Sequence, residues 1–172
     1  DLSRDALYKN VEIYNLMKAL QIEENIEKLR YNQVILATDA DVDGLHIRNL
    51  MITFFMRFFE PLVSDDHLKI LETPLFRVRN KKQTIYCYTE EERKEAMDKI
   101  GRSAEITRFK GLGEISPGEF KEFISKDGIR LTDVSIKNDQ STSDIINFYM
   151  GKNTPDRREY IMNHLVVDAE MM

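Results

Sequence analysis

The sequence predicts an α/β fold: a domain with a parallel sheet, then a β-hairpin, then a mostly helical C-terminal tail. Three observations support this class. The continuous apolar run at residues 34–37 is typical of a buried strand. Apolar side chains then recur at helical spacing from Ile47 to Phe58, as in a helix packed on a sheet. Beyond residue 107 the patterns are mainly helical, so we expect most strands before that point.

The other elements follow in chain order. Helical spacing runs from Leu7 to Met17, with Ser3 as the expected cap, and a second short helical segment is expected at residues 23–29. The long helix after the apolar run is expected to end near Pro61. Further strands are predicted at residues 67–71, 75–78 and 84–88, the last two joined as a hairpin. Further helices are predicted at residues 90–100, 119–124, 143–150 and 155–165.

Three aspartates directly follow the apolar strand, in the sequence DADVDG at residues 39–44. Alternate residues of an extended chain share a face, so we expect Asp39 and Asp41 to converge, with Asp43 placed to cap the following helix. Carboxylates this close repel one another unless a cation lies between them. Hard oxygen ligands suit Mg²⁺ or Mn²⁺. The sequence therefore predicts a divalent-metal site at the end of this strand.

Three other interpretations of the acidic turn compete with a magnesium site. Aspartates occur in turns and at helix starts for purely local reasons. The same residues begin a calcium-binding EF-hand loop, but its twelfth position, a glutamate, falls here on Leu50, and a helix should precede it. An apolar strand ending in Asp-x-Asp also resembles phosphatases of the haloacid-dehalogenase type, with Asp39 as nucleophile. That enzyme needs a second acidic strand end, and Asp65 and Asp66 lie instead in a turn before His67.

A basic pair runs into two glycines in the sequence TRFKGLGE at residues 107–114. Arg108 and Lys110 precede Gly111 and Gly113, where a backbone without side-chain bulk can approach a phosphate closely. An ordinary glycine loop between a strand and a helix is the alternative.

The sequence TPDRRE at residues 154–159 predicts a helix start, with Thr154 as N-cap and Pro155 in the first turn. Arg157 and Arg158 then lie where positive charge opposes the helix dipole, which points to an external anion. A salt bridge to a neighbouring acid, or plain solvation, is the alternative.

Taken in this order, the three segments resemble the B subunits of bacterial type IIA DNA topoisomerases, most closely those of the topoisomerase IV type. The family's TOPRIM signature, Asp-x-Asp-x-Asp-Gly-x-His-Ile-Arg, matches residues 39–48 throughout. Its Arg-Phe/Tyr-Lys-Gly-Leu-Gly-Glu segment matches residues 108–114, and its late Arg-Arg-Glu matches residues 157–159. The resemblance implies a partial, Rossmann-like TOPRIM domain that lacks its first strand at residues 1–74. A hairpin and helix connector would follow at 75–106, and the family's C-terminal tail at 107–172.

The resemblance also implies the chemistry, which is double-strand DNA cleavage, strand passage and religation. The nucleophile in that family is a tyrosine of the partner A subunit, in an A2B2 heterotetramer. Asp39 and Asp41 are implied as catalytic ligands of Mg²⁺, or of Mn²⁺, with Asp43 as a further ligand. Such a cation stabilises charge on the leaving oxygen and anchors a phosphate. DNA contacts are implied for His46, Lys110, Arg157 and Arg158.

One family feature has no counterpart in this sequence. The family's Glu-Gly-Asp-Ser-Ala segment, whose glutamate completes the metal site, does not precede Asp39, and we find no Walker-type nucleotide loop. ATP is therefore expected to act only through an upstream domain that this chain lacks. We expect a C-terminal piece of a longer subunit that is inactive by itself.

Composition favours a cytoplasmic protein without a membrane anchor, and the resemblance implies association with the nucleoid. Cys87 is the only cysteine, so no internal disulfide is expected. The most apolar stretch, residues 50–59, is too short to span a bilayer. The net charge of -5 does not by itself indicate a nucleic-acid partner, but basic residues cluster locally, as at residues 77–82, and their distribution decides DNA attraction.

Three functions stay open from the sequence. The first is the metal- and DNA-binding part of a type IIA topoisomerase B subunit, of topoisomerase IV or, alternatively, of DNA gyrase. The second is a phosphatase with Asp39 as nucleophile. The third is a non-catalytic module that docks the A subunit.

Overall fold

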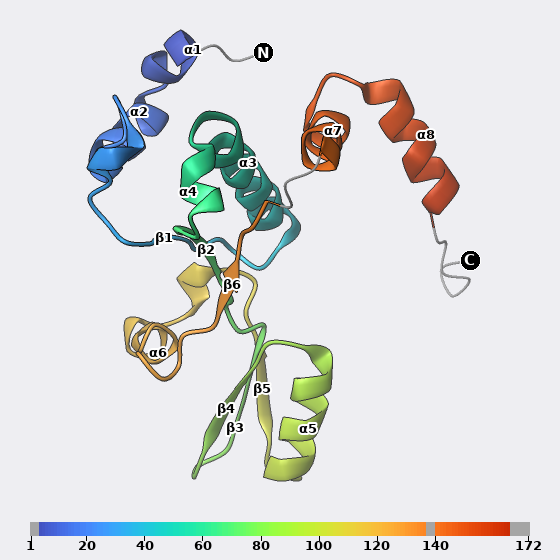
Figure 1. Cartoon of the computed structure of the whole chain (residues 1–172). Helices are drawn as coiled ribbons and strands as arrows, with labels where there is room; N and C mark the ends of the chain where they lie inside the picture. The colour runs from blue at the N-terminus through green and yellow to red at the C-terminus, as the bar shows by residue number, and fades with distance from the viewer. Residues whose placement is uncertain (1–3, 137–139, 166–172) are drawn as a thin grey trace. The chain divides into compact units, whose positions relative to one another are not determined.

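Figure 1 shows a computed structural model of the chain, which describes residues 4–136 and 140–165. Ser3, the expected cap of the first helix, lies outside the described residues. Contacts divide the chain into two compact units, residues 1–135 and 136–172. The division into three sections at residues 74 and 106 stays a prediction.

The first unit begins with two short helices, α1 (Arg4–Lys9) and α2 (Val11–Leu20), where the sequence predicts one. Asn10 breaks the helix because its side-chain oxygen accepts a hydrogen bond from the backbone N–H of Ile13 at 3.0 Å, as an N-cap does. The second helical segment is only a single 3₁₀ turn, η1 (Ile26–Lys28).

The first sheet has the strand order β1-β2-β6, with β1 (Val34–Leu36), β2 (Leu68–Leu71) and β6 (Leu131–Asp133). The predicted parallel pairing is confirmed for β1 and β2, which align Val34 with Leu68. β6, which was not predicted, adds to β2 in the antiparallel sense. Because β1 is an edge strand, its middle residue Ile35 is 40% exposed, and the expectation of a fully buried strand is wrong.

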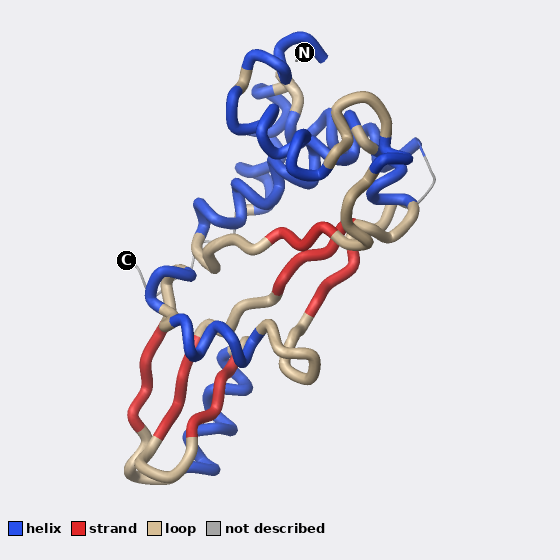
Figure 2. Tube along the Cα trace, turned by 90° about the vertical axis from the view of Figure 1, so that its left-hand side faces the viewer, coloured by secondary structure: helices blue, strands red, loops and turns tan. Residues whose placement is uncertain are grey.

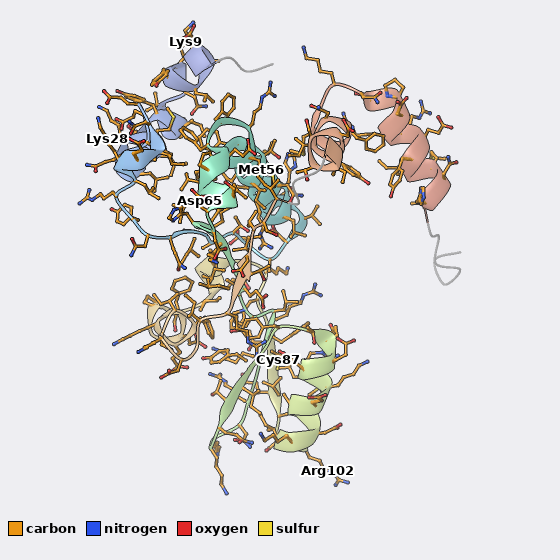
Figure 3. All side chains as sticks on the ribbon, viewed as in Figure 1. Lys9, Lys28, Met56, Asp65, Cys87 and Arg102 are labelled. Atoms are coloured by element: carbon orange, nitrogen blue, oxygen red, sulfur yellow. The ribbon has the colours of Figure 1, made fainter. Side chains whose placement is uncertain are left out.

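Between β1 and β2 the chain crosses through α3 (Val42–Phe58) and α4 (Glu60–Ser64). The predicted single helix ending near Pro61 is broken at Phe59, and Pro61 lies in the first turn of α4, where a missing N–H is tolerated. Figure 3 marks Met56 on α3 and Asp65 at the end of α4. The helices bury a mainly aromatic group beside the sheet: Phe54, Phe55, Phe59, Leu62 and Val63.

The second sheet has the order β4-β3-β5, with β3 (Phe76–Arg79), β4 (Thr84–Cys87) and β5 (Glu105–Arg108). The predicted hairpin of β3 and β4 is confirmed. α5 (Glu90–Ile100) lies along this sheet, and Ala96 and Ile100 pack on a core that includes the free, buried Cys87, marked in Figure 3. Figure 2 shows the two groups of three strands as separate sheets.

The glycine segment follows β5 as a 3₁₀ turn, η2 (Leu112–Glu114), and leads into α6 (Pro117–Phe123) before the chain returns to the first sheet as β6. α6 confirms a predicted helix. None of the helices within the described ranges is both long and apolar enough to cross a membrane.

The second unit holds the two predicted C-terminal helices, α7 (Gln140–Met150) and α8 (Thr154–His164). They meet through aromatic rings, with Tyr160 at 5.8 Å from Phe148 and 6.0 Å from Tyr149 between centroids. Thr154 is the first helical residue rather than the predicted cap; Asn153 holds that position without a side-chain capping bond.

Candidate metal centre

The acidic turn joins the end of β1 to the start of α3, as the sequence predicts. Asp41, not Asp43, is the N-cap of α3: its Oδ1 accepts the backbone N–H of Gly44 at 2.7 Å. The expectation for Asp43 is therefore wrong, because the helix begins at Val42 and Asp43 falls in its first turn. An acid there still interacts favourably with the helix dipole.

The backbone of Asp39 approaches Gly44 so closely that position 44 has no room for a side chain. A Cβ at this position would lie 2.1 Å from the carbonyl oxygen of Asp39, far inside van der Waals contact. The first turn of α3 therefore folds directly against the chain leaving β1. On the other side of the turn, Arg48 Nε donates to Thr38 Oγ1 at 3.2 Å and further ties the helix to the strand end.

Asp39 meets the glycine segment, which is distant in sequence. Its Oδ1 accepts the backbone N–H of Leu112 at 2.7 Å. A Cβ on Gly111 would lie 2.9–3.0 Å from the carboxylate atoms of Asp39, so a side chain there would press against it. Reasoning from the residues alone missed this contact, although the paired glycines at 111 and 113 signalled a close approach.

The chemistry of this donor set fits a hard divalent cation. Asp39, Asp41 and Asp43 are all exposed, and none forms an ion pair with a described residue. Asp39 and Asp41 each use one carboxylate oxygen to accept a backbone N–H, and no described residue donates a hydrogen bond to the other oxygen. Within the described ranges, however, no three His, Cys, Asp or Glu side chains are arranged together as a metal site. The turn supplies suitable ligands without a preformed cluster.

The residues implied as DNA contacts differ in their surroundings. His46 on α3 and Lys110 before η2 are exposed, and Lys110 lies two residues from the Leu112 amide that binds Asp39. Its own backbone N–H donates to Glu114 at 2.9 Å. Lys110 thus joins the acidic turn through the glycine segment, whereas Arg157 and Arg158 belong to the second unit.

Arg157 is engaged inside the second unit. Its guanidinium donates to three carbonyl oxygens at the end of α7, those of Phe148 at 3.1 Å, Tyr149 at 3.2 Å and Gly151 at 2.6 Å. Positive charge at the first turn of α8 opposes that helix, but the same charge complements the C-terminus of α7. The guanidinium of Arg157 is thus hydrogen-bonded within the unit, and its expected contact with an external anion stays a prediction. Arg158 is exposed.

Two of the four basic residues in the cluster expected at residues 77–82 are neutralised by ion pairs. Arg77 pairs with Glu119 on α6 at 2.5 Å, and Arg79 pairs with Glu105 on β5 at 3.0 Å. Lys81 and Lys82 at the hairpin turn remain exposed. The sequence could not reveal these pairs, because their members are 42 and 26 residues apart.

In the Arg77–Glu119 pair, which joins β3 to α6, both side chains are largely buried. The two side chains are 17% and 19% exposed. Tyr86 also donates to Glu119, at 3.2 Å. Burial alone would raise the pKa of the Glu119 carboxyl, but hydrogen bonds from Ser116 and Arg77 outweigh it and lower the pKa to about 2. Burial raises the pKa of Tyr86 to about 12.

The geometry of the first sheet speaks against the phosphatase. β1 and β2 are parallel; Asp39 follows the C-terminal end of β1, whereas Asp65 and Asp66 precede the N-terminal end of β2. The two acidic groups therefore lie at opposite ends of the sheet and cannot share a substrate. Leu50 lies within α3, so the calcium-loop interpretation also lacks its twelfth ligand.

Two family models match the chain over separate ranges. The Toprim domain matches residues 7–73, and the carboxyl terminus of the DNA gyrase B subunit matches residues 101–162. The first range contains the acidic turn and α3, and the second contains the glycine segment, α7 and most of α8.

Curated relatives agree with both matches. The B subunit of DNA topoisomerase 4 from Borreliella burgdorferi is 57% identical over 164 residues, covering 95% of this chain and 27% of the relative. The DNA gyrase B subunit of Archaeoglobus fulgidus is 35% identical, covering 91% of the chain and 25% of the relative. The chain thus spans about a quarter of the length of these relatives.

A solved structure shares the fold. The DNA-binding, cleavage and re-ligation domain of Plasmodium falciparum topoisomerase II superposes with a TM-score of 0.76 at 26% identity, covering 98% of this chain and 24% of that one. Together with the Toprim fold and the acidic turn, these findings show that the chain belongs to the B-subunit family of type IIA DNA topoisomerases.

Proposed function

We propose that this chain forms the Mg²⁺-binding and DNA-contacting part of a topoisomerase IV B subunit. The observation that carries the proposal is the bond from the Leu112 amide to Asp39. It unites the acidic turn with the basic glycine segment, so that metal ligands and Lys110 belong to one surface. A phosphodiester site needs acidic and basic residues together. The metal ion bridges the acidic ligands to a phosphate, and nearby basic side chains hold the DNA strand.

The topoisomerase IV type is favoured over gyrase by one relative. The Borreliella burgdorferi protein is 57% identical to this chain. Other relatives do not separate the types, since the topoisomerase 4 B subunit of Rickettsia bellii and the gyrase B subunit of Spiroplasma citri are both 38% identical. A DNA gyrase B subunit is the alternative within the family.

In the proposed reaction, residues of this chain bind Mg²⁺ and orient the DNA strand. Asp39 and Asp41 hold Mg²⁺ with their free carboxylate oxygens, and Asp43 adds a ligand. The bound cation would stabilise negative charge on the leaving oxygen of the cleaved strand. His46, Lys110, Arg157 and Arg158 contact DNA phosphates. The bonds from Arg157 to the end of α7 also fix the start of α8. The nucleophilic tyrosine comes from an A subunit.

The proposal places the chain in a larger, ATP-dependent enzyme. Two B and two A subunits would act together in DNA cleavage, strand passage and religation, in the cytoplasm at the nucleoid. ATP would bind to a part of the B subunit outside these 172 residues. The chain alone would lack cleavage activity, because the nucleophilic tyrosine belongs to the A subunit.

The test replaces the matched segment of the Borreliella burgdorferi relative by this chain and adds that organism's A subunit. Mg²⁺-dependent DNA cleavage is compared between the parent and Asp41→Asn. Asparagine caps a helix about as well as aspartate, so this change removes a charged ligand while keeping the start of α3. The matched control is Asp65→Asn, an exposed acid at the end of α4.

We expect cleavage to fall at least about 100-fold in Asp41→Asn, because loss of a ligand should cost no less than the upper end of the range for residues that only orient one. Cleavage should persist in Asp65→Asn. Equal cleavage in the parent and in both variants would refute the metal role. If Asp39→Ala also retained cleavage, the chain would be a docking module instead. A covalent aspartyl-phosphate on Asp39 with a small phosphate substrate would establish the phosphatase.

A further inference from the structure

We propose that the glycine segment is a positioning element for Asp39, with the Leu112 amide fixing the carboxylate and Gly111 providing the space for it. This inference rests on the proposed metal role of Asp39 and assigns a task to a segment otherwise interpreted only as phosphate-facing. In this role the glycine segment comprises residues 110–114.

Only one of the two glycines in the segment lies against Asp39. Gly111 has the carboxylate of Asp39 within 3.0 Å of an ideal Cβ position, whereas Gly113, two residues later, has no atom within 4 Å. A methyl group at 111 must push the carboxylate aside, and one at 113 meets open space. The two glycines of the segment therefore have different roles, and only the first is fitted to Asp39.

The segment is closed on itself and holds its amide in place. Glu114 N–H donates to the Gly111 carbonyl at 3.2 Å, and Ile115 N–H donates to the Leu112 carbonyl at 3.2 Å. The Glu114 carboxylate reaches back to the Lys110 amide at 2.9 Å. The Leu112 amide, which these bonds leave unused, points at Asp39 instead.

Buried side chains anchor the segment on both flanks. Phe109 and Ile115 are 3% and 7% exposed and pack with Phe123 of α6 in one apolar cluster. Phe109 N–H also donates to the Leu75 carbonyl at 2.8 Å, which fixes the entry to β3. The segment thus has a rigid base on the second sheet while its tip touches the turn after β1.

The Arg77–Glu119 pair secures the same base. Glu119 belongs to the capping box that starts α6 directly after the segment, and its partner Arg77 lies in the middle strand of the second sheet. A held carboxylate costs less conformational entropy when a cation binds than a free one does. Residues 110–114, which are anchored on the second sheet, therefore hold Asp39, the proposed metal ligand after β1 of the first sheet, in place before a cation binds.

The first experiment measures cation binding by the 172-residue chain. Mn²⁺ binding is followed by the loss of the free-ion electron paramagnetic resonance signal for the parent, Gly111→Ala, Gly113→Ala and Asp39→Asn. We expect Gly111→Ala to weaken the affinity about 10-fold, in the range for residues that orient a metal ligand, and Gly113→Ala to leave it unchanged. Equal affinities for the two glycine variants would overturn the inference. Parent affinity equal to that of Asp39→Asn would instead overturn the metal role of Asp39.

A second measurement needs neither a bound cation nor a folded Gly111→Ala variant. Amide hydrogen exchange is compared between the parent and Asp39→Ala, which removes the acceptor. The Leu112 amide is expected to exchange at least about 10-fold faster in the variant, whereas the Lys110 amide, bonded to Glu114, keeps its rate. An unchanged Leu112 rate would show that Asp39 and the segment are not coupled, whatever the outcome for Mn²⁺.

Discussion

Replacing Glu119 by glutamine tests how firmly α6 is joined to the second sheet. The pKa of Glu119 lies at about 2 against an ordinary 4.5. A shift of that size corresponds to about 3 kcal/mol of stability at neutral pH. The figure is an upper estimate, because Arg77 Nε is buried without a hydrogen-bond partner among the described residues, so the pair is not fully satisfied.

The contribution of Glu119 to the free energy of unfolding depends on pH. A carboxyl whose pKa is lowered in the folded state stabilises it above the unfolded value near 4.5, and this contribution is lost as the pH falls toward 2. We therefore expect Glu119→Gln to lower the free energy of unfolding by about 3 kcal/mol at pH 7 but only by about 1 kcal/mol at pH 3.

The chain supplies a matched control on the same strand. Arg79 lies two residues after Arg77 and pairs with Glu105, but these side chains are 42% and 62% exposed. Exposed pairs contribute about 0–1 kcal/mol, so Glu105→Gln should have little effect. Urea unfolding followed by circular dichroism at both pH values measures all three proteins. A loss for Glu119→Gln no larger than for Glu105→Gln, or one that does not shrink at pH 3, would refute the reasoning.

Two further predictions concern local structure. Gly44→Ala places a Cβ 2.1 Å from the Asp39 carbonyl oxygen and should destabilise the fold by about 3 kcal/mol in urea unfolding; Gly118→Ala, with no atom within 4 Å, should not, and comparable losses would show that the turn relaxes. Arg157→Ala removes three bonds to the end of α7 and should weaken protection of that end by about 1–2 kcal/mol in amide exchange. Arg158→Ala should leave it unchanged; equal effects would contradict the capping role.

Features encoded locally could be predicted from the sequence. The helix at residues 90–100 agrees with α5 because its charge pattern, the cap at Thr89 and the stop at Gly101 all lie within a few residues. In the same way, the apolar run predicts β1 and the helical spacing predicts α3, which places the acidic turn between them. The break at Asn10 was missed because apolar periodicity continued across a residue that caps by its side chain.

Features that depend on distant contacts could not be predicted from the residues alone. β6 has three residues and forms only by pairing with β2 some sixty residues earlier. The bond between Asp39 and Leu112 joins residues 73 apart, and nothing near either position identifies its partner. The family resemblance implied a functional role for each segment, but not a contact between them.

The structure changes the meaning of the three aspartates. From the sequence, their mutual repulsion argued for a cation between them. In the fold, Asp41 accepts the Gly44 amide at the positive end of α3, and Asp39 accepts the Leu112 amide, so backbone dipoles already offset part of the negative charge. The turn can therefore form before a cation binds, and its acids serve structure as well as chemistry. Removing a charge while keeping the cap, as in Asp41→Asn, is the change that separates these two roles.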